Sequence, residues 1–157
     1  MRPSRPAFLA VLVVLPAVIT WAVLEAAYVS LPPLPWTAVP TLLLLALGEA
    51  FTGWHVLRRI RRKPGTQPME PMVVARLAAL AKASAHAAAV LAGVFGGFAL
   101  GVSDLLDKTT PRHDFFVSGG TALAALVLVG AAFFLEYACR VPKGPEDEHR
   151  GRGASRA

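Results

Sequence analysis

VVARLAALAKASAHAAAVLAGVFGGFALGV, the stretch from Val73 to Val102, decides the class of protein to which this chain belongs. It consists mainly of Ala, Val, Leu and Gly, and its ionisable residues are Arg76, Lys82 and His86. A helix needs about 20 apolar residues to cross the hydrocarbon core of a bilayer. This stretch exceeds that length, so the sequence predicts a transmembrane helix here.

Three further apolar runs of membrane-spanning length extend over residues 7–29, 37–57 and 117–137. Lipid offers no hydrogen-bond partner to a backbone, so each run is expected to be helical. The sequence therefore predicts an all-α, polytopic membrane protein with four transmembrane helices. Its domains would be a transmembrane domain, residues 1–142, and a disordered cytoplasmic tail, residues 143–157.

The composition favours the same class. The 157 residues are 55% apolar and 17% charged, whereas soluble domains carry about 25% charge. The net charge of +6 comes from basic residues that flank the apolar runs, which argues against a nucleic-acid partner. The first run is longer than the core of a signal peptide and lacks a small-residue cleavage site after it, so we expect it to be retained.

The loops differ in their basic residues, which predicts the orientation. The middle loop carries a basic cluster that consists of Arg58, Arg59, Arg61, Arg62 and Lys63. Residues 30–36 contain neither Lys nor Arg, and residues 103–116 contain more acidic than basic side chains. Because Lys and Arg remain in cytoplasmic loops, both termini are predicted to be cytoplasmic, in a bacterial plasma membrane. The basic cluster is also expected to contact anionic lipid.

Ionisable residues within membrane helices are candidate functional residues. Here the candidate polar cluster comprises Glu49, Lys82, His86, Glu136 and Arg140. We expect Lys82 to pair with Glu136 or Glu49, and Arg140 to pair with Glu136 four residues earlier on the same helix. The cluster would either specify helix packing, form a proton or ion relay, or receive an anionic head group.

Gly93, Gly97 and Gly101 form a ridge of small residues along one face of the predicted third helix. Such a seam lets two helix backbones approach closely. The partner could be another helix of the same chain, which we favour, or a second copy of the chain in a homodimer.

No sequence motif indicates catalysis. The chain contains neither a P-loop nor a nucleotide fingerprint nor metal-ligand spacing among its histidines, so we expect no enzymatic activity and no cofactor. The leading interpretation is a non-enzymatic membrane protein that binds a lipid or an unknown protein partner. The alternative is a small transporter or transporter accessory that uses the Lys/Glu cluster, and the third is a membrane enzyme acting on a lipid-linked substrate.

Three motifs resemble a known family. They are LAKASA at residues 80–85, LEYACRVP at residues 135–142 and LPPLPW at residues 31–36. Together they are similar to a domain-of-unknown-function family of small actinobacterial membrane proteins, often encoded near folate-biosynthesis genes. The resemblance covers nearly all of the chain up to Pro142 and implies a four-helix plasma-membrane protein, without an assigned activity.

Overall fold

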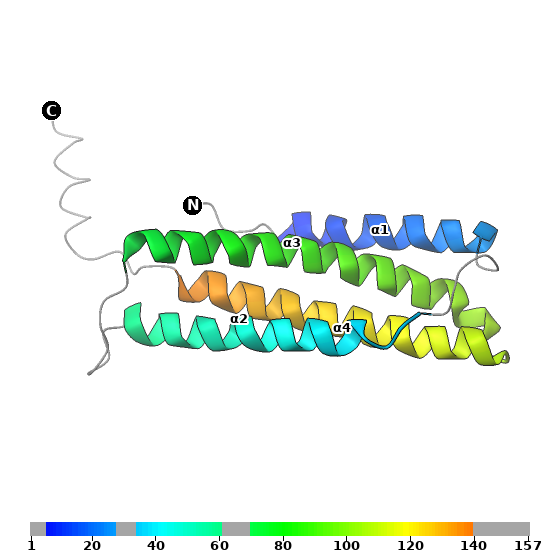
Figure 1. The fold of residues 1–157 in the computed structure, drawn as a ribbon. Helices are drawn as coiled ribbons and strands as arrows, with labels where there is room; N and C mark the ends of the chain where they lie inside the picture. Colours follow the sequence, from blue (N-terminus) through cyan, green and yellow to red (C-terminus); the bar gives the residue numbers. More distant parts are fainter. Residues whose placement is uncertain (1–5, 28–33, 61–69, 140–157) are drawn as a thin grey trace, which may run out of the picture.

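The computed structural model describes residues 6–27, 34–60 and 70–139. It contains the helices α1 (Pro6–Ala27), α2 (Ala38–Ile60), α3 (Pro71–Val102) and α4 (Thr109–Ala138), with the short 3-10 helix η2 (Ser103–Leu105) between α3 and α4 (Figure 1). The described residues form no strand, which confirms the all-α prediction. The predicted tail, residues 143–157, lies outside the described ranges.

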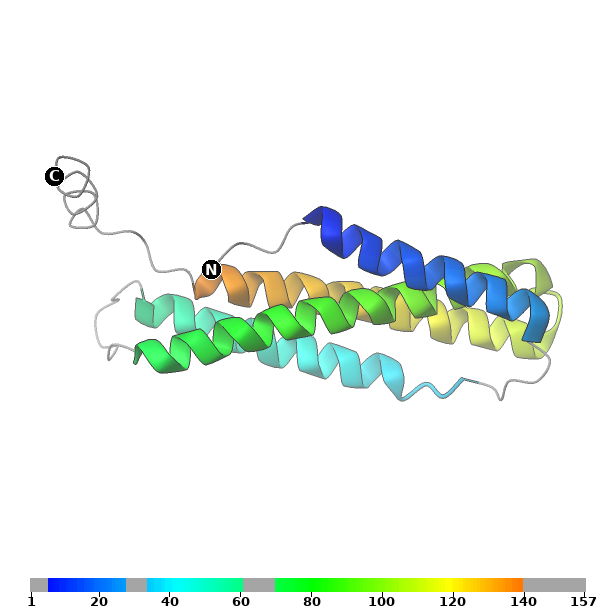
Figure 2. The ribbon, with the colours of Figure 1, turned by 90° about the horizontal axis from the view of Figure 1, so that it is seen from above.

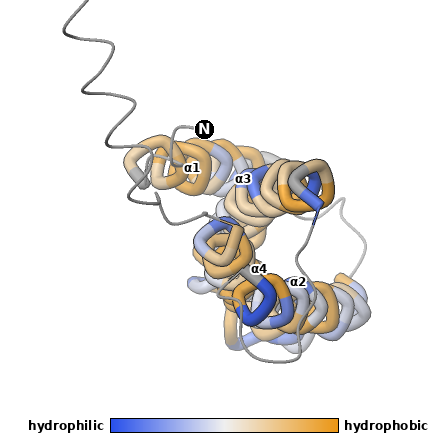
Figure 3. Tube along the Cα trace, turned by 90° about the vertical axis from the view of Figure 1, so that its left-hand side faces the viewer, coloured by the Kyte–Doolittle hydropathy of each residue, from blue (hydrophilic) through white to orange (hydrophobic). Residues whose placement is uncertain are grey.

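Each of the four long helices is apolar and long enough to cross a membrane. Large apolar side chains point outward along them and are exposed in the isolated chain, notably Val14, Ile19, Leu44, Leu47 and Leu123. The tube in Figure 3, coloured by hydropathy, is apolar over most of the helices. A surface of this kind suits contact with lipid better than contact with water.

The start of α4 differs from the prediction. The helix begins at Thr109, whereas the apolar run begins at Val117. The charged residues of the stretch 103–116 predict a loop, but a polar sequence can be helical where the helix extends beyond the apolar layer. Pro111 is compatible with this start, because the N–H groups of a first helical turn have no partner within the helix.

The helices are packed in the order α1, α3, α4, α2 (Figure 3). Each is antiparallel to the next one in the chain (Figures 1 and 2). α1 packs along α3, α3 along α4, and α4 along α2; among the described residues no comparable packing joins α1 to α2 or α4. α1 and α2 are therefore edge helices. The end at which α2 finishes and α3 begins is called the α2–α3 end below, and the opposite one the α3–α4 end.

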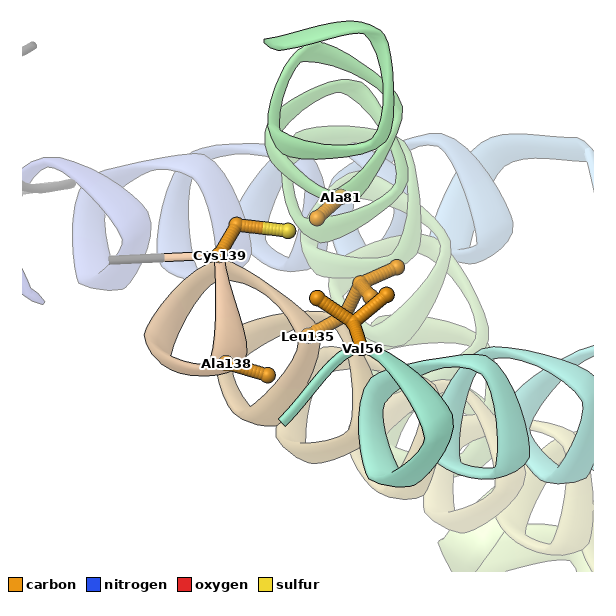
Figure 4. Close-up of a cluster of buried hydrophobic side chains, with 5 residues drawn as sticks. All are labelled: Val56, Ala81, Leu135, Ala138 and Cys139. Carbon is orange, nitrogen blue, oxygen red and sulfur yellow. The ribbon is translucent and has the colours of Figure 1, made fainter. Parts of the chain in front are cut away.

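Three clusters of buried apolar side chains form the core. The cluster at the α3–α4 end consists of Leu24, Phe98 and Val102. The central cluster is Ala46, Ala88 and Leu128. The cluster at the α2–α3 end is Val56, Ala81, Leu135, Ala138 and Cys139 (Figure 4). The last two clusters each combine α2, α3 and α4, so side chains of α2 and α3 meet over the face of α4.

Candidate functional site

The buried face of α2 is a seam along α4. Its residues follow one another in alternate steps of four and three: Leu42, Ala46, Glu49, Gly53 and Val56. This is the spacing of a helix that packs along one partner. A methyl group at Gly53 would overlap with the ring of Phe134, so the two helices lie close together. Because Glu49 belongs to this seam, its side chain lies in the interior of the helix bundle.

Glu49 is the central residue of α2 and is buried, with 5% of its surface exposed. The hydroxyl of Ser84, on α3, is hydrogen-bonded to its carboxyl group. The oxygen Oε2 has no hydrogen-bond partner within the part of the chain that the structure describes. The observed bounds of α2 place Glu49 at the midpoint of the helix.

Lys82 and His86 lie on a different face of α3 from Ser84. Each is two residues away from Ser84, and residues at this spacing point to opposite sides of a helix. Lys82 is exposed. The Nδ1–H of His86 donates to the backbone carbonyl of Lys82, and the His86 ring packs against Phe8 of α1 at 5.7 Å between centroids. The structure therefore does not bring Lys82 next to Glu49.

Glu136 is half-buried near the α2–α3 end of α4. Neither Glu136 nor Lys82 is without an interaction partner. Because α3 and α4 pack along each other, a pair between these two side chains stays a prediction. Arg140 lies outside the described residues.

The glycine seam of α3 faces α1 of the same chain. A Cβ on Gly93 would overlap with the carbonyl group of Val13, and one on Gly97 with that of Ala17. At Gly101 the nearest neighbour is the side chain of Leu24. The two backbones are thus in contact, and a homodimer built on this seam would have to displace α1.

A groove of about 320 Å³ lies at the α2–α3 end, and Arg59 of the basic cluster is part of its lining. Its polar lining is Thr52, His55 and Arg59, and its apolar lining is Phe51, Val56 and Leu77. Arg58 and Arg59 are exposed in the last turn of α2, whereas Arg61, Arg62 and Lys63 lie outside the described residues. The sequence predicted the basic cluster but not this groove, because Leu77 comes from another helix.

A polar network at the α3–α4 end was also not predicted. Asp114 of α4 is buried, with 2% of its surface exposed, and its Oδ1 accepts the backbone N–H of Leu34 at 3.0 Å. His113 contacts the same oxygen at 3.4 Å and accepts the indole N–H of Trp36 at 3.0 Å. The signal in the sequence was the helical spacing of Asp114 with Ser118 and Thr121, which are buried on one face.

A wider cleft of about 900 Å³ lies between α1 and the α3–α4 turn at the same end. Its charged lining residues are Glu25, Asp104 and Lys108, all exposed. Over residues 6–27, 34–60 and 70–139, no three His, Cys, Asp or Glu side chains are grouped as metal ligands.

The fold and these sites define a small all-α protein with four helices of membrane-spanning length. The chain belongs to the DUF3180 family of proteins of unknown function, which matches residues 9–143. This confirms the resemblance to a domain-of-unknown-function family. No curated protein and no solved structure matches the chain.

Proposed function

We propose that this protein is a non-enzymatic, integral plasma-membrane protein that binds anionic phospholipid at the α2–α3 end. Membrane insertion is supported by the four apolar helices and by the apolar side chains exposed along α1 and α2. Within a bilayer these side chains meet acyl chains, and the helical backbone satisfies its own polar groups.

In the proposed orientation the α2–α3 end is cytoplasmic. The N-terminal end of α1 and the C-terminal end of α4 face this same end (Figure 2), and Arg58 and Arg59 lie there in the last turn of α2. Single cysteines placed at Lys63 and Leu106, in a Cys139→Ser background, test this topology in intact cells. A membrane-impermeant maleimide should label position 106 alone. Labelling of position 63 from outside would reverse the orientation.

The groove beside Arg59 is the observation that supports lipid binding. Arg59 and His55 line the same groove of about 320 Å³ as the apolar side chains of Phe51 and Leu77. A lipid phosphate suits the guanidinium because it accepts several charge-assisted hydrogen bonds. An acyl chain suits Phe51 and Leu77. Each neighbouring basic residue adds about 1 kcal/mol of attraction to an anionic surface.

Arg58 offers a matched control for Arg59. Both are exposed in the last turn of α2, but only Arg59 lines the groove. We would reconstitute the wild type, Arg59→Gln and Arg58→Gln in nanodiscs of phosphatidylcholine with increasing phosphatidylglycerol, and count retained lipid by native mass spectrometry. The Arg59 variant should lose bound phosphatidylglycerol, while the Arg58 variant keeps most of it. Equal losses would mean general charge attraction, and no loss in either would refute the lipid site.

A further inference from the structure

The surroundings of Glu49 are apolar on both sides along the helix axis. The central cluster, Ala46, Ala88 and Leu128, lies toward one end, and the cluster that contains Val56 lies toward the other. Glu49 is therefore enclosed by three helices at the midpoint of α2. An ionised carboxylate in such a place is strongly unfavourable unless a cation or enough hydrogen-bond donors compensate for its lost hydration.

The described side chains that face Glu49 provide no cation. From α3 the polar neighbour is Ser84, while Lys82 and His86 point to another side of that helix. The buried face of α4 at this level carries Leu128, Ala132 and Leu135.

The remaining charged groups lie further along the helices. On α2 they are Arg58 and Arg59, exposed in its last turn. On α4 the nearest is Glu136, which follows Leu135 toward the α2–α3 end. Among the described residues, the hydrogen bond from Ser84 is therefore the polar contact of the Glu49 carboxyl group, and its Oε2 has no partner there.

We propose that Glu49 is a proton-binding site in the membrane interior, whose proton resides on Oε2 and exchanges with the cytoplasm through the groove beside Arg59. A neutral carboxyl needs no counter-ion, and its second oxygen still accepts the Ser84 hydroxyl. Thr52, which lines the groove, is one helical turn from Glu49 toward the α2–α3 end. The groove thus brings solvent to within one turn of the carboxyl, and His55 lines the same groove one turn beyond Thr52.

This inference rests on the proposed membrane insertion and orientation, but not on lipid binding. Loss of lipid from Arg59→Gln tests the lipid site alone, and the cysteine labelling tests the orientation alone. The proton site has its own chemical readout. Dicyclohexylcarbodiimide enters membranes and reacts with a protonated carboxyl, which adds across its C=N bond and rearranges to a stable N-acylurea.

The experiment uses the full chain in sealed vesicles of both orientations, with the pH set separately on each side. Peptide mass spectrometry should find the adduct on Glu49, and its yield should fall as the cytoplasmic-side pH is raised. Glu49→Gln should lose the adduct, whereas Glu25→Gln, at an exposed carboxyl, should retain it. Absence of an adduct at Glu49, or a yield that follows only the external pH, would overturn the proposal.

Two further measurements test the proton site even if the Glu49→Gln variant does not fold. The infrared spectrum of the wild type should contain the C=O band of a protonated carboxyl, and an absent band would refute the site. Thr52→Val keeps the shape of Thr52 but removes its hydroxyl from the groove. It should slow the response of Glu49 labelling to a cytoplasmic pH jump several-fold, and an unchanged rate would refute the route.

Discussion

The indole Nε1–H of Trp36 donates a hydrogen bond to Nε2 of His113, joining positions 77 residues apart in the chain. Because the indole can only donate, Nε2 must accept, and the neutral His113 ring then carries its proton on Nδ1. That N–H faces Oδ1 of Asp114, which also accepts the N–H of Leu34. The segment before α2 is thus attached to α4 by two hydrogen bonds, and the contact between His113 and Asp114 within α4 links their acceptors.

Asp114→Ala should destabilise the protein by about 1–3 kcal/mol, since it leaves the Leu34 N–H without its acceptor. Asp114→Asn keeps an acceptor oxygen at the same place and should cost less. Thermal unfolding in detergent, followed by circular dichroism, measures both. If the two variants were equally unstable, the carboxylate charge would matter rather than the Leu34 hydrogen bond.

Gly97→Ala should separate α1 from α3, because the new methyl group overlaps with the carbonyl group of Ala17. Overpacking of this kind costs about 1–3 kcal/mol. Gly96→Ala is the control: a Cβ there meets nothing within 4 Å, and alanine favours the helix. Thermal unfolding of the two variants should therefore shift in opposite directions, and equal shifts would exclude close α1–α3 contact.

Lys82 and Glu136 are predicted to stabilise each other. Lys82→Met and Glu136→Gln should each lower the melting temperature, and the double variant should lose less than the sum of the two. A double-mutant cycle with a coupling of about 0.5 kcal/mol or more would support the pair. Strict additivity would mean that each side chain acts through another partner.

Cys139 should react slowly with maleimides at neutral pH. Burial raises the pKa of its thiol, so the reactive thiolate is a smaller fraction at pH 7 and grows only as the pH rises toward the raised value. The thiol also points toward Ala81 inside the core (Figure 4). Alkylation should accelerate on unfolding. A Cys139→Ser/Glu70→Cys variant, with its thiol at an exposed position, should react fast when folded, and equal rates for the two folded proteins would contradict the burial argument.

The sequence predicted the four helices because transfer into lipid depends on the summed hydropathy of one helix at a time. It also singled out Glu49, since a carboxylate stands out in an apolar run. The choice of packing partner depends on the fit of two helix surfaces, such as Gly93 against Val13. The hydrophobic periodicity of one helix does not indicate which other helix packs against it. For the same reason the sequence leaves two possible acidic partners for Lys82, and it does not indicate Ser84, a common residue in such helices, as a partner of Glu49.

The order α1, α3, α4, α2 has a consequence for biogenesis. During synthesis α1 and α2 leave the ribosome first, yet the helices along which they pack, α3 and α4, belong to the second half of the chain. In the proposed membrane topology, α1 and α2 therefore enter the bilayer before their packing partners exist. The side of α1 that faces the glycines of α3, and the Glu49 seam of α2, are covered only when α3 and α4 arrive. Chains shortened after residue 69 should consequently be recognised by membrane proteases as unassembled.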